Sequence, residues 1–196
     1  MVDIYLVGVG GQGIITASKI IGNAAILAGD DVLLSETHGM AQRGGSVVCT
    51  ARIGDSKDPL IPDGKADVIL SLELLETVRA LCKASEETVV VASTETMVPL
   101  SVSTQKMKYP SFQEVKESVE AISGKALFVD SREIAEEEGV PISSNIVMVG
   151  ALAGTGVTGI ESSFFESAIE MSIRRNIQEN RRAFARGVEL GKQALC

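Results

Sequence analysis

Apolar and polar positions alternate with two different periods along this chain, and the pattern predicts strands and helices in turn. An apolar run at 4–7 leads into the glycines of 8–13, and residues 14–27 are apolar over more than one helical stripe before Gly29 ends the helix. A second apolar run follows at 32–35, and 36–45 is predicted to be a loop. Residues 47–53 then alternate strictly. Because a parallel crossover needs a dozen or more residues, this third strand should run antiparallel to its neighbours.

Strands and helices continue to alternate through the rest of the chain. Further strands are predicted at 66–71, 88–92 and 126–130, and further helices at 74–82, 111–122, 132–139, 145–154 and 163–177. A final helical stripe follows at 184, 188, 191 and 195. Residues 93–110 have no clean period and read as a loop excursion with one irregular strand. The order predicts one α/β domain over 1–196, a three-layer α/β/α sandwich around a Rossmann-like, mostly parallel but mixed sheet.

The helix predicted at 145–154 has almost no polar face. Gly150 and Gly154 would let a neighbouring backbone come close, and burial partly by another subunit would lead the isolated chain to self-associate. Two helix starts carry capping residues. Ser111 with Glu114 forms a capping box, and Ser163 with Glu166 is predicted to cap the next helix.

Composition narrows the class of protein. With 196 residues, of which 45% are hydrophobic, the chain is long enough for one substantial core, and its net charge of −8 argues against non-specific nucleic-acid binding. The three cysteines show no C-x-x-C spacing, so no iron–sulfur cluster, structural zinc or disulfide framework is expected in this chain alone. No leader or membrane-spanning run is recognised, and a cytoplasmic location is predicted.

The glycine segment at 8–13 is the stretch most suggestive of binding. Gly8, Gly10 and Gly13 fit G-x-G-x-x-G between an apolar strand and a helix, where glycine allows close backbone approach and the first helical N–H groups are free for an anion. The alternative is that these glycines only make a tight turn. A dinucleotide is disfavoured, because Glu36, roughly where a ribose-binding acid would stand, opens an unusual loop instead.

The segment 36–45 supplies the second candidate. Loops that follow neighbouring strands should meet in one crevice, where they would form an anion or polar cofactor site or else a subunit-docking loop. Arg43 stands out, since a guanidinium fork reads carboxylate or phosphate bidentately. No catalytic residue and no metal ligand is predicted. The candidate binding residues are Gly8, Gly10, Gly11, Gln12, Gly13, Thr37, His38, Gln42 and Arg43.

These two segments together, 7–14 and 35–47, resemble the gamma-type module of the 2-oxoacid:ferredoxin oxidoreductases. The sequence of the second loop is most similar to that of the small (beta) subunit of the indolepyruvate enzymes of that family. Residues 145–154 and 180–187 resemble later family segments, so the likeness covers most of the chain. Two long motifs at family spacing are more specific than a lone glycine fingerprint.

The resemblance implies an obligate subunit of an enzyme that oxidatively decarboxylates an aryl 2-oxoacid with coenzyme A, giving an aryl-acetyl-CoA, CO2 and reduced ferredoxin. Thiamine diphosphate, Mg and the [4Fe–4S] clusters would lie on a larger partner subunit, and the isolated chain would be inactive. The two loops would line the active-site channel near coenzyme A or the substrate carboxylate, and the resemblance leaves both of these ligands open. The alternative is a non-catalytic stabilising module of a pyruvate, 2-oxoisovalerate or 2-oxoglutarate enzyme. A free-standing Rossmann-type oxidoreductase is disfavoured, because no acid–base set accompanies the fingerprint.

Overall fold

The computed structural model describes residues 1–38, 44–97 and 109–194, and these form a single mixed sheet with helices on both faces. The strand order is β2-β3-β1-β4-β5-β6. In chain order the strands are β1 (Val2–Val9), β2 (Val32–His38), β3 (Ser46–Ile53), β4 (Val68–Ser71), β5 (Val89–Ser93) and β6 (Lys125–Val129). Only β3 runs against the others, pairing antiparallel with both β1 and β2. The predicted mixed, mostly parallel sheet is confirmed.

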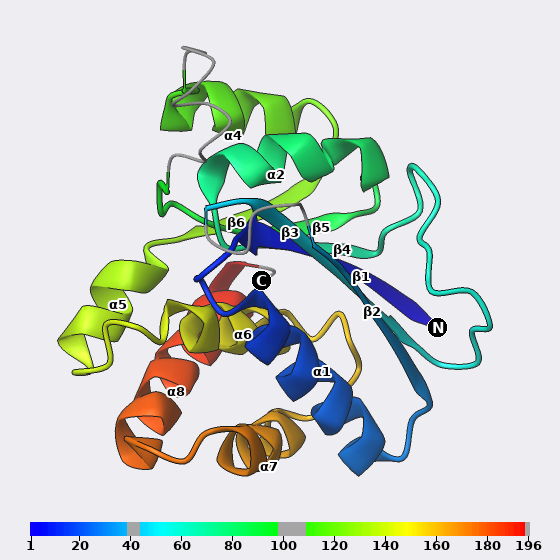
Figure 1. Cartoon of the computed structure of the whole chain (residues 1–196). Helices are drawn as coiled ribbons and strands as arrows, with labels where there is room; N and C mark the ends of the chain where they lie inside the picture. Colours follow the sequence, from blue (N-terminus) through cyan, green and yellow to red (C-terminus); the bar gives the residue numbers. More distant parts are fainter. Residues whose placement is uncertain (39–43, 98–108, 195–196) are drawn as a thin grey trace.

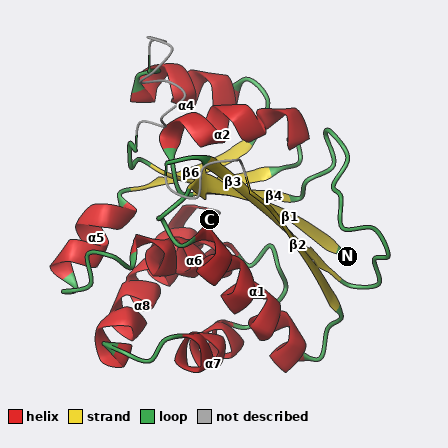
Figure 2. Cartoon of the chain, in the orientation of Figure 1, coloured by secondary structure: helices red, strands yellow, loops and turns green. Residues whose placement is uncertain are grey.

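Helices form the outer layers of the sandwich (Figure 1). One face of the sheet carries α1 (Ile14–Ala28), α5 (Ser131–Glu137), α6 (Ser144–Thr155), α7 (Ser162–Ser172) and α8 (Ile177–Ala194). The other carries α2 (Leu74–Ala80), continued by the 3-10 turn η1 (Leu81–Lys83), and α4 (Phe112–Glu120), which pack on β1, β4, β5 and β6. Two buried clusters, one on each face, therefore make up the core. None of the helices that the structure describes covers the second face of β2 and β3 (Figure 2).

The apolar helix α6 is covered by its own chain. Its residues from Ser144 to Ala153 are buried, and it packs on α1, α5, α7 and α8. Gly150 and Gly154 lie against the backbone of α8, as their small size predicts. Burial by another subunit is therefore not needed, and the reason for expecting self-association of the isolated chain is removed.

Several element boundaries differ from the sequence pattern. β2 runs three residues further than predicted, because Glu36, Thr37 and His38 pair with Cys49, Val48 and Val47 of β3. The predicted cap of α7 is wrong. This helix starts at Ser162 after Glu161, and its N-cap makes no side-chain hydrogen bond. The Ser111 capping box on α4 is confirmed, and most of the 93–110 excursion lies outside the described residues. Among the helices described, none has the length and apolarity to cross a bilayer.

Candidate functional site

The two glycine segments meet at the carboxyl end of β1. The Gly10 N–H donates to the Gly45 carbonyl at 2.8 Å, and the Gly44 N–H donates back to the Gly10 carbonyl at 3.3 Å. The prediction that the loops after β1 and β2 share one edge of the sheet is confirmed. Gln42 and Arg43 lie outside the described residues, as does the side chain of His38.

Packing explains part of the glycine fingerprint. A Cβ on Gly8 would stand 2.9 Å from Cγ1 of Ile14, and a Cβ on Gly13 would stand 2.6 Å from Nδ2 of Asn145. Gly13 also has a φ of 79° as the N-cap of α1. Gly11 differs, because its φ is 112° but a Cβ on it would meet no atom within 4 Å. The tight-turn interpretation therefore accounts for Gly8 and Gly13, while Gly11 faces open space.

Gln12 closes the crevice between β1 and β4. Its Oε1 accepts from the Val9 N–H at 2.9 Å, and its Nε2 donates to the Leu72 carbonyl at 2.8 Å. Here the chain connections pass to opposite faces of the sheet, since α1 follows β1 on one side and α2 follows β4 on the other. Ligands of open α/β sheets commonly bind at such a point. In this chain the buried Gln12 amide fills the crevice between β1 and β4 and supports the glycine loop that follows β1.

A hollow of about 310 Å³ lies on the helical side of this loop. We call it the glycine hollow. The start of α1 faces it with no acidic residue in the first turn and no side-chain cap, which suits an anion. Its lining residues are Val9, Gly10, Gly11, Gly13, Ile14, Ile15, Thr16 and Val47.

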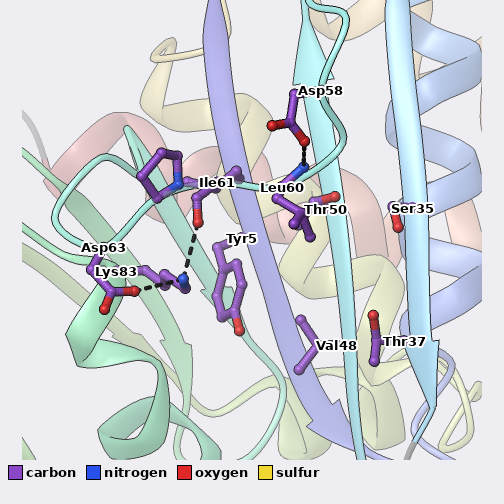
Figure 3. Close-up of a pocket in the computed structure, with 11 residues that line it drawn as sticks. Tyr5, Ser35, Thr37, Val48, Thr50, Asp58, Leu60, Ile61, Asp63 and Lys83 are labelled. Atoms are coloured by element: carbon purple, nitrogen blue, oxygen red, sulfur yellow. Dashed lines mark hydrogen bonds and ion pairs between the residues drawn. The ribbon is translucent and has the colours of Figure 1, made fainter.

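Thr37 does not share this hollow. Successive strand residues point to opposite faces, so Thr37 instead lines a slot of about 480 Å³ on the open face of the sheet, with Tyr5 and Val48 (Figure 3). The loop over the slot is held by Lys83, whose Nζ donates to the Ile61 carbonyl at 3.0 Å and to Asp63 at 2.6 Å. The structure thus separates Thr37 from the other candidate residues that it describes.

Two buried carboxylates tie the surrounding loops to the start of α2, and neither was predicted from the sequence. Glu73 accepts from the Met97 N–H at 3.1 Å and from the Tyr109 hydroxyl, so it fixes both ends of the excursion between them. Glu76 accepts from the Ser46 hydroxyl at 2.7 Å, next to the second glycine segment. The sequence did carry a signal for Glu73, because an acidic residue between a strand and a helix is a common N-cap, and Glu73 is the N-cap of α2.

Burial raises the pKa of Glu73, although hydrogen bonds from Tyr109 and from backbone N–H groups act to lower it. A carboxyl with a higher pKa in the folded chain holds its proton more tightly when folded. Folding stability is therefore lost as pH rises from the unfolded pKa through the folded one.

We expect the Glu73→Gln variant to lack this pH dependence. The free energy of unfolding of the wild type, minus that of the variant, should fall with rising pH by about 1.4 kcal/mol for each unit separating the two pKa values of Glu73. Urea titrations of both proteins from about pH 4 to about pH 8 would measure it. A difference that instead rises with pH would mean that the hydrogen bonds outweigh burial.

Metal-ligating residues do not gather in the part of the chain that the structure describes, where no group of three or more His, Cys, Asp or Glu could hold an ion. Cys49 and Cys82 are free thiols there, and burial raises the pKa of the Cys49 thiol to about 11.

The chain is similar in sequence and in fold to subunits of oxidoreductases that act on 2-oxoacids. Residues 3–190 match the model of the family described as pyruvate ferredoxin/flavodoxin oxidoreductase. The chain is 42% identical to indolepyruvate oxidoreductase subunit IorB of Methanothermobacter thermautotrophicus, over 94% of this chain and 95% of that protein. It is 30% identical to the pyruvate/ketoisovalerate oxidoreductases common subunit gamma of Pyrococcus abyssi, over 95% and 94%. The crystal structure of the gamma subunit of a keto/oxoacid ferredoxin oxidoreductase from Geobacter sulfurreducens superposes with a TM-score of 0.72 at 25% identity, covering 99% of this chain and all of that one.

Proposed function

The chain belongs to the pyruvate ferredoxin/flavodoxin oxidoreductase family, and from this premise we propose its function. It is the small subunit of an indolepyruvate ferredoxin oxidoreductase. The observation that carries the assignment is the similarity to IorB subunits over nearly the whole length of both chains, which exceeds the similarity to the pyruvate/ketoisovalerate subunits. The enzyme would convert an aryl 2-oxoacid and coenzyme A to an aryl-acetyl-CoA and CO2 while reducing ferredoxin.

The catalytic cofactors would lie on a larger partner subunit. Thiamine diphosphate, with Mg, would supply the stabilisation of the carbanion, and [4Fe–4S] clusters would carry the electrons to ferredoxin. This chain would supply binding and orientation. Its free thiols suit the reducing cytoplasm, where we place the complex.

Within the complex, the glycine hollow would form part of the channel wall. Gly11 and Gly13 would offer backbone N–H groups to a carboxylate or phosphate, and Gly10, whose N–H donates to the Gly45 carbonyl, would join the two segments. Arg43 of the second segment would add a guanidinium that can bind such an anion bidentately. Gly8 and Gln12 would shape the loop from behind, because their surroundings are filled by Ile14, Val9 and Leu72. Thr37 and His38 would then contribute through the β2–β3 pairing that leads into the second segment. The alternative is that the same loops only dock the partner.

Expression of each subunit alone and of both together tests the function. The isolated chain should contain no cluster iron and show no turnover, whereas the pair should reduce methyl viologen with indolepyruvate and coenzyme A. Comparing indolepyruvate with pyruvate, 2-oxoisovalerate and 2-oxoglutarate separates the proposal from its alternative. Cluster iron in the purified small chain, or a clear preference of the pair for an aliphatic 2-oxoacid, would contradict it.

A further inference from the structure

The loop between α7 and α8 carries two adjacent arginines, Arg174 and Arg175. Every other arginine that the structure describes forms an ion pair with an aspartate or a glutamate. Arg174 and Arg175 form none within the described ranges 1–38, 44–97 and 109–194. In a chain with a net charge of −8, these two adjacent and exposed guanidinium groups are open to the carboxylates of another molecule.

These arginines lie at one end of a connected series of hollows. The glycine hollow shares Thr16 with a second hollow of about 400 Å³ along α1, which is also lined by Lys19 and Asn23. The second hollow shares Ser172 with a third hollow of about 550 Å³, which is lined by Arg174 and Arg175. Among the lining residues that the structure describes, none in the three hollows carries a carboxylate. We call this surface, from the glycine hollow past Lys19 to Arg175, the cationic track.

Exposed apolar side chains follow the same surface. Ile142 in the third hollow is 91% exposed, and Ile26 in the second is 62% exposed. Apolar side chains mixed with arginine are typical of a protein interface, whereas a site for a small anion does not require exposed apolar side chains.

One buried polar atom at the third hollow also lacks a partner. Asn180 is 2% exposed and its Nδ2 donates to the Asn176 carbonyl at 2.8 Å, but its Oδ1 accepts no hydrogen bond from the residues that the structure describes. Asn180 lines the hollow. A buried carbonyl oxygen without a donor is uncommon, so the described residues leave the hydrogen bonding at this end of the track incomplete.

We propose that the cationic track is the docking surface for an acidic segment of the larger subunit. Carboxylates of that segment would face Lys19, Arg174 and Arg175, and an apolar side chain of the segment would cover Ile142. Because the glycine hollow forms the other end of the track, docking there would place the partner directly beside the proposed channel wall. This inference rests on the proposed function, since it presumes that the larger subunit exists.

Charge reversal at the two arginines tests the proposal. The affinity of the small chain for the larger subunit is measured at two salt concentrations, using the pair that reconstitutes turnover. Arg174→Glu/Arg175→Glu should weaken binding about a hundredfold at low salt and reduce its salt dependence. The control Lys57→Glu/Lys65→Glu changes the net charge equally at exposed residues outside the track, and its affinity should stay within about threefold of the wild type. Ile142→Ser, which replaces an exposed side chain that folding does not need, should weaken binding about tenfold.

Each other outcome overturns the proposal in a different way. Unchanged affinity of the arginine variant, with unchanged kinetics, would show that the track is not the docking surface. Unchanged affinity with a raised KM for coenzyme A or the 2-oxoacid would make the track a site for a small anion instead. If the wild-type chain neither binds the larger subunit nor supports turnover, the proposed function fails, and this inference fails with it.

Discussion

Alanine at Gly187 should destabilise the fold by at least about 3 kcal/mol, although alanine is the better helix former. A Cβ on Gly187 would lie 2.1 Å from the Val147 carbonyl oxygen and 2.8 Å from the Ala151 nitrogen. Both are backbone atoms of α6, so no side-chain rotation can relieve the contact. The two helices would have to separate, and α6 is buried on nearly every side.

Four glycines make this helix crossing. Cβ atoms on Gly150, Gly154 and Gly191 would each lie 2.2 Å from a backbone carbonyl oxygen of the opposite helix. Because the pairs interlock, α6 and α8 approach more closely than helices with side chains between them can. The contact area that they bury together is therefore lost as a unit when one glycine gains a methyl group.

Gly22 provides the matched control, since it also lies inside a helix. The atoms nearest to its Cβ would all belong to the Leu34 side chain, the first of them Cδ1 at 2.7 Å, and Leu34 is partly exposed and able to move. Gly22→Ala should therefore leave stability within about 1 kcal/mol of the wild type. Denaturant unfolding of the three proteins measures the difference. A Gly187→Ala protein as stable as the wild type would show that α6 and α8 can separate at little cost.

The periodic elements were predictable because their pattern reflects burial on both faces of the sheet. The reversed direction of β3 also followed from the short connection before it, and Gly150 and Gly154 indicated a close backbone. The end of β2 could not be predicted. An edge strand needs only one hydrogen-bonded neighbour and no buried face, so Glu36 and Thr37 pair with β3 while their polar composition is typical of a loop.

The site was predictable only as far as topology decides it. Loops after strands that point the same way meet at one edge, and Gly10 and Gly45 do so. The face on which Thr37 lies depends on whether β2 continues past Ser35, so an error in the length of the strand became an error in the site. The burial of Glu73 depends on Met97 and Tyr109, far along the chain, and no local pattern reports such contacts.

The second large effect is expected at the opposite end of β1, where Asp3→Ala should cost about 3–5 kcal/mol of stability. Asp3 and Arg52 are directly opposite each other on β1 and β3, and both are buried. Nε and Nη2 of Arg52 each donate to one carboxylate oxygen of Asp3 at 2.8 Å. Removing the carboxylate would leave a buried guanidinium without its counter-charge, which is the costly way to break such a pair.

Arg52 also holds the loop that covers the slot on the open face, because its Nη1 donates to the carbonyls of Asp58 at 2.8 Å and Leu60 at 3.1 Å. Asp3→Ala should therefore raise hydrogen exchange in residues 55–63, in addition to the loss of global stability that denaturant unfolding measures.

Asp3→Leu/Arg52→Met removes both charges and keeps much of the buried volume, so it should cost less stability than Asp3→Ala even though it alters more atoms. The exposed pair Arg132–Glu136 is the control, where Arg132→Ala should cost less than about 1 kcal/mol. A double variant less stable than Asp3→Ala would mean that the Arg52 contacts to the loop, and not the relief of a buried charge, decide the stability of this end of the sheet.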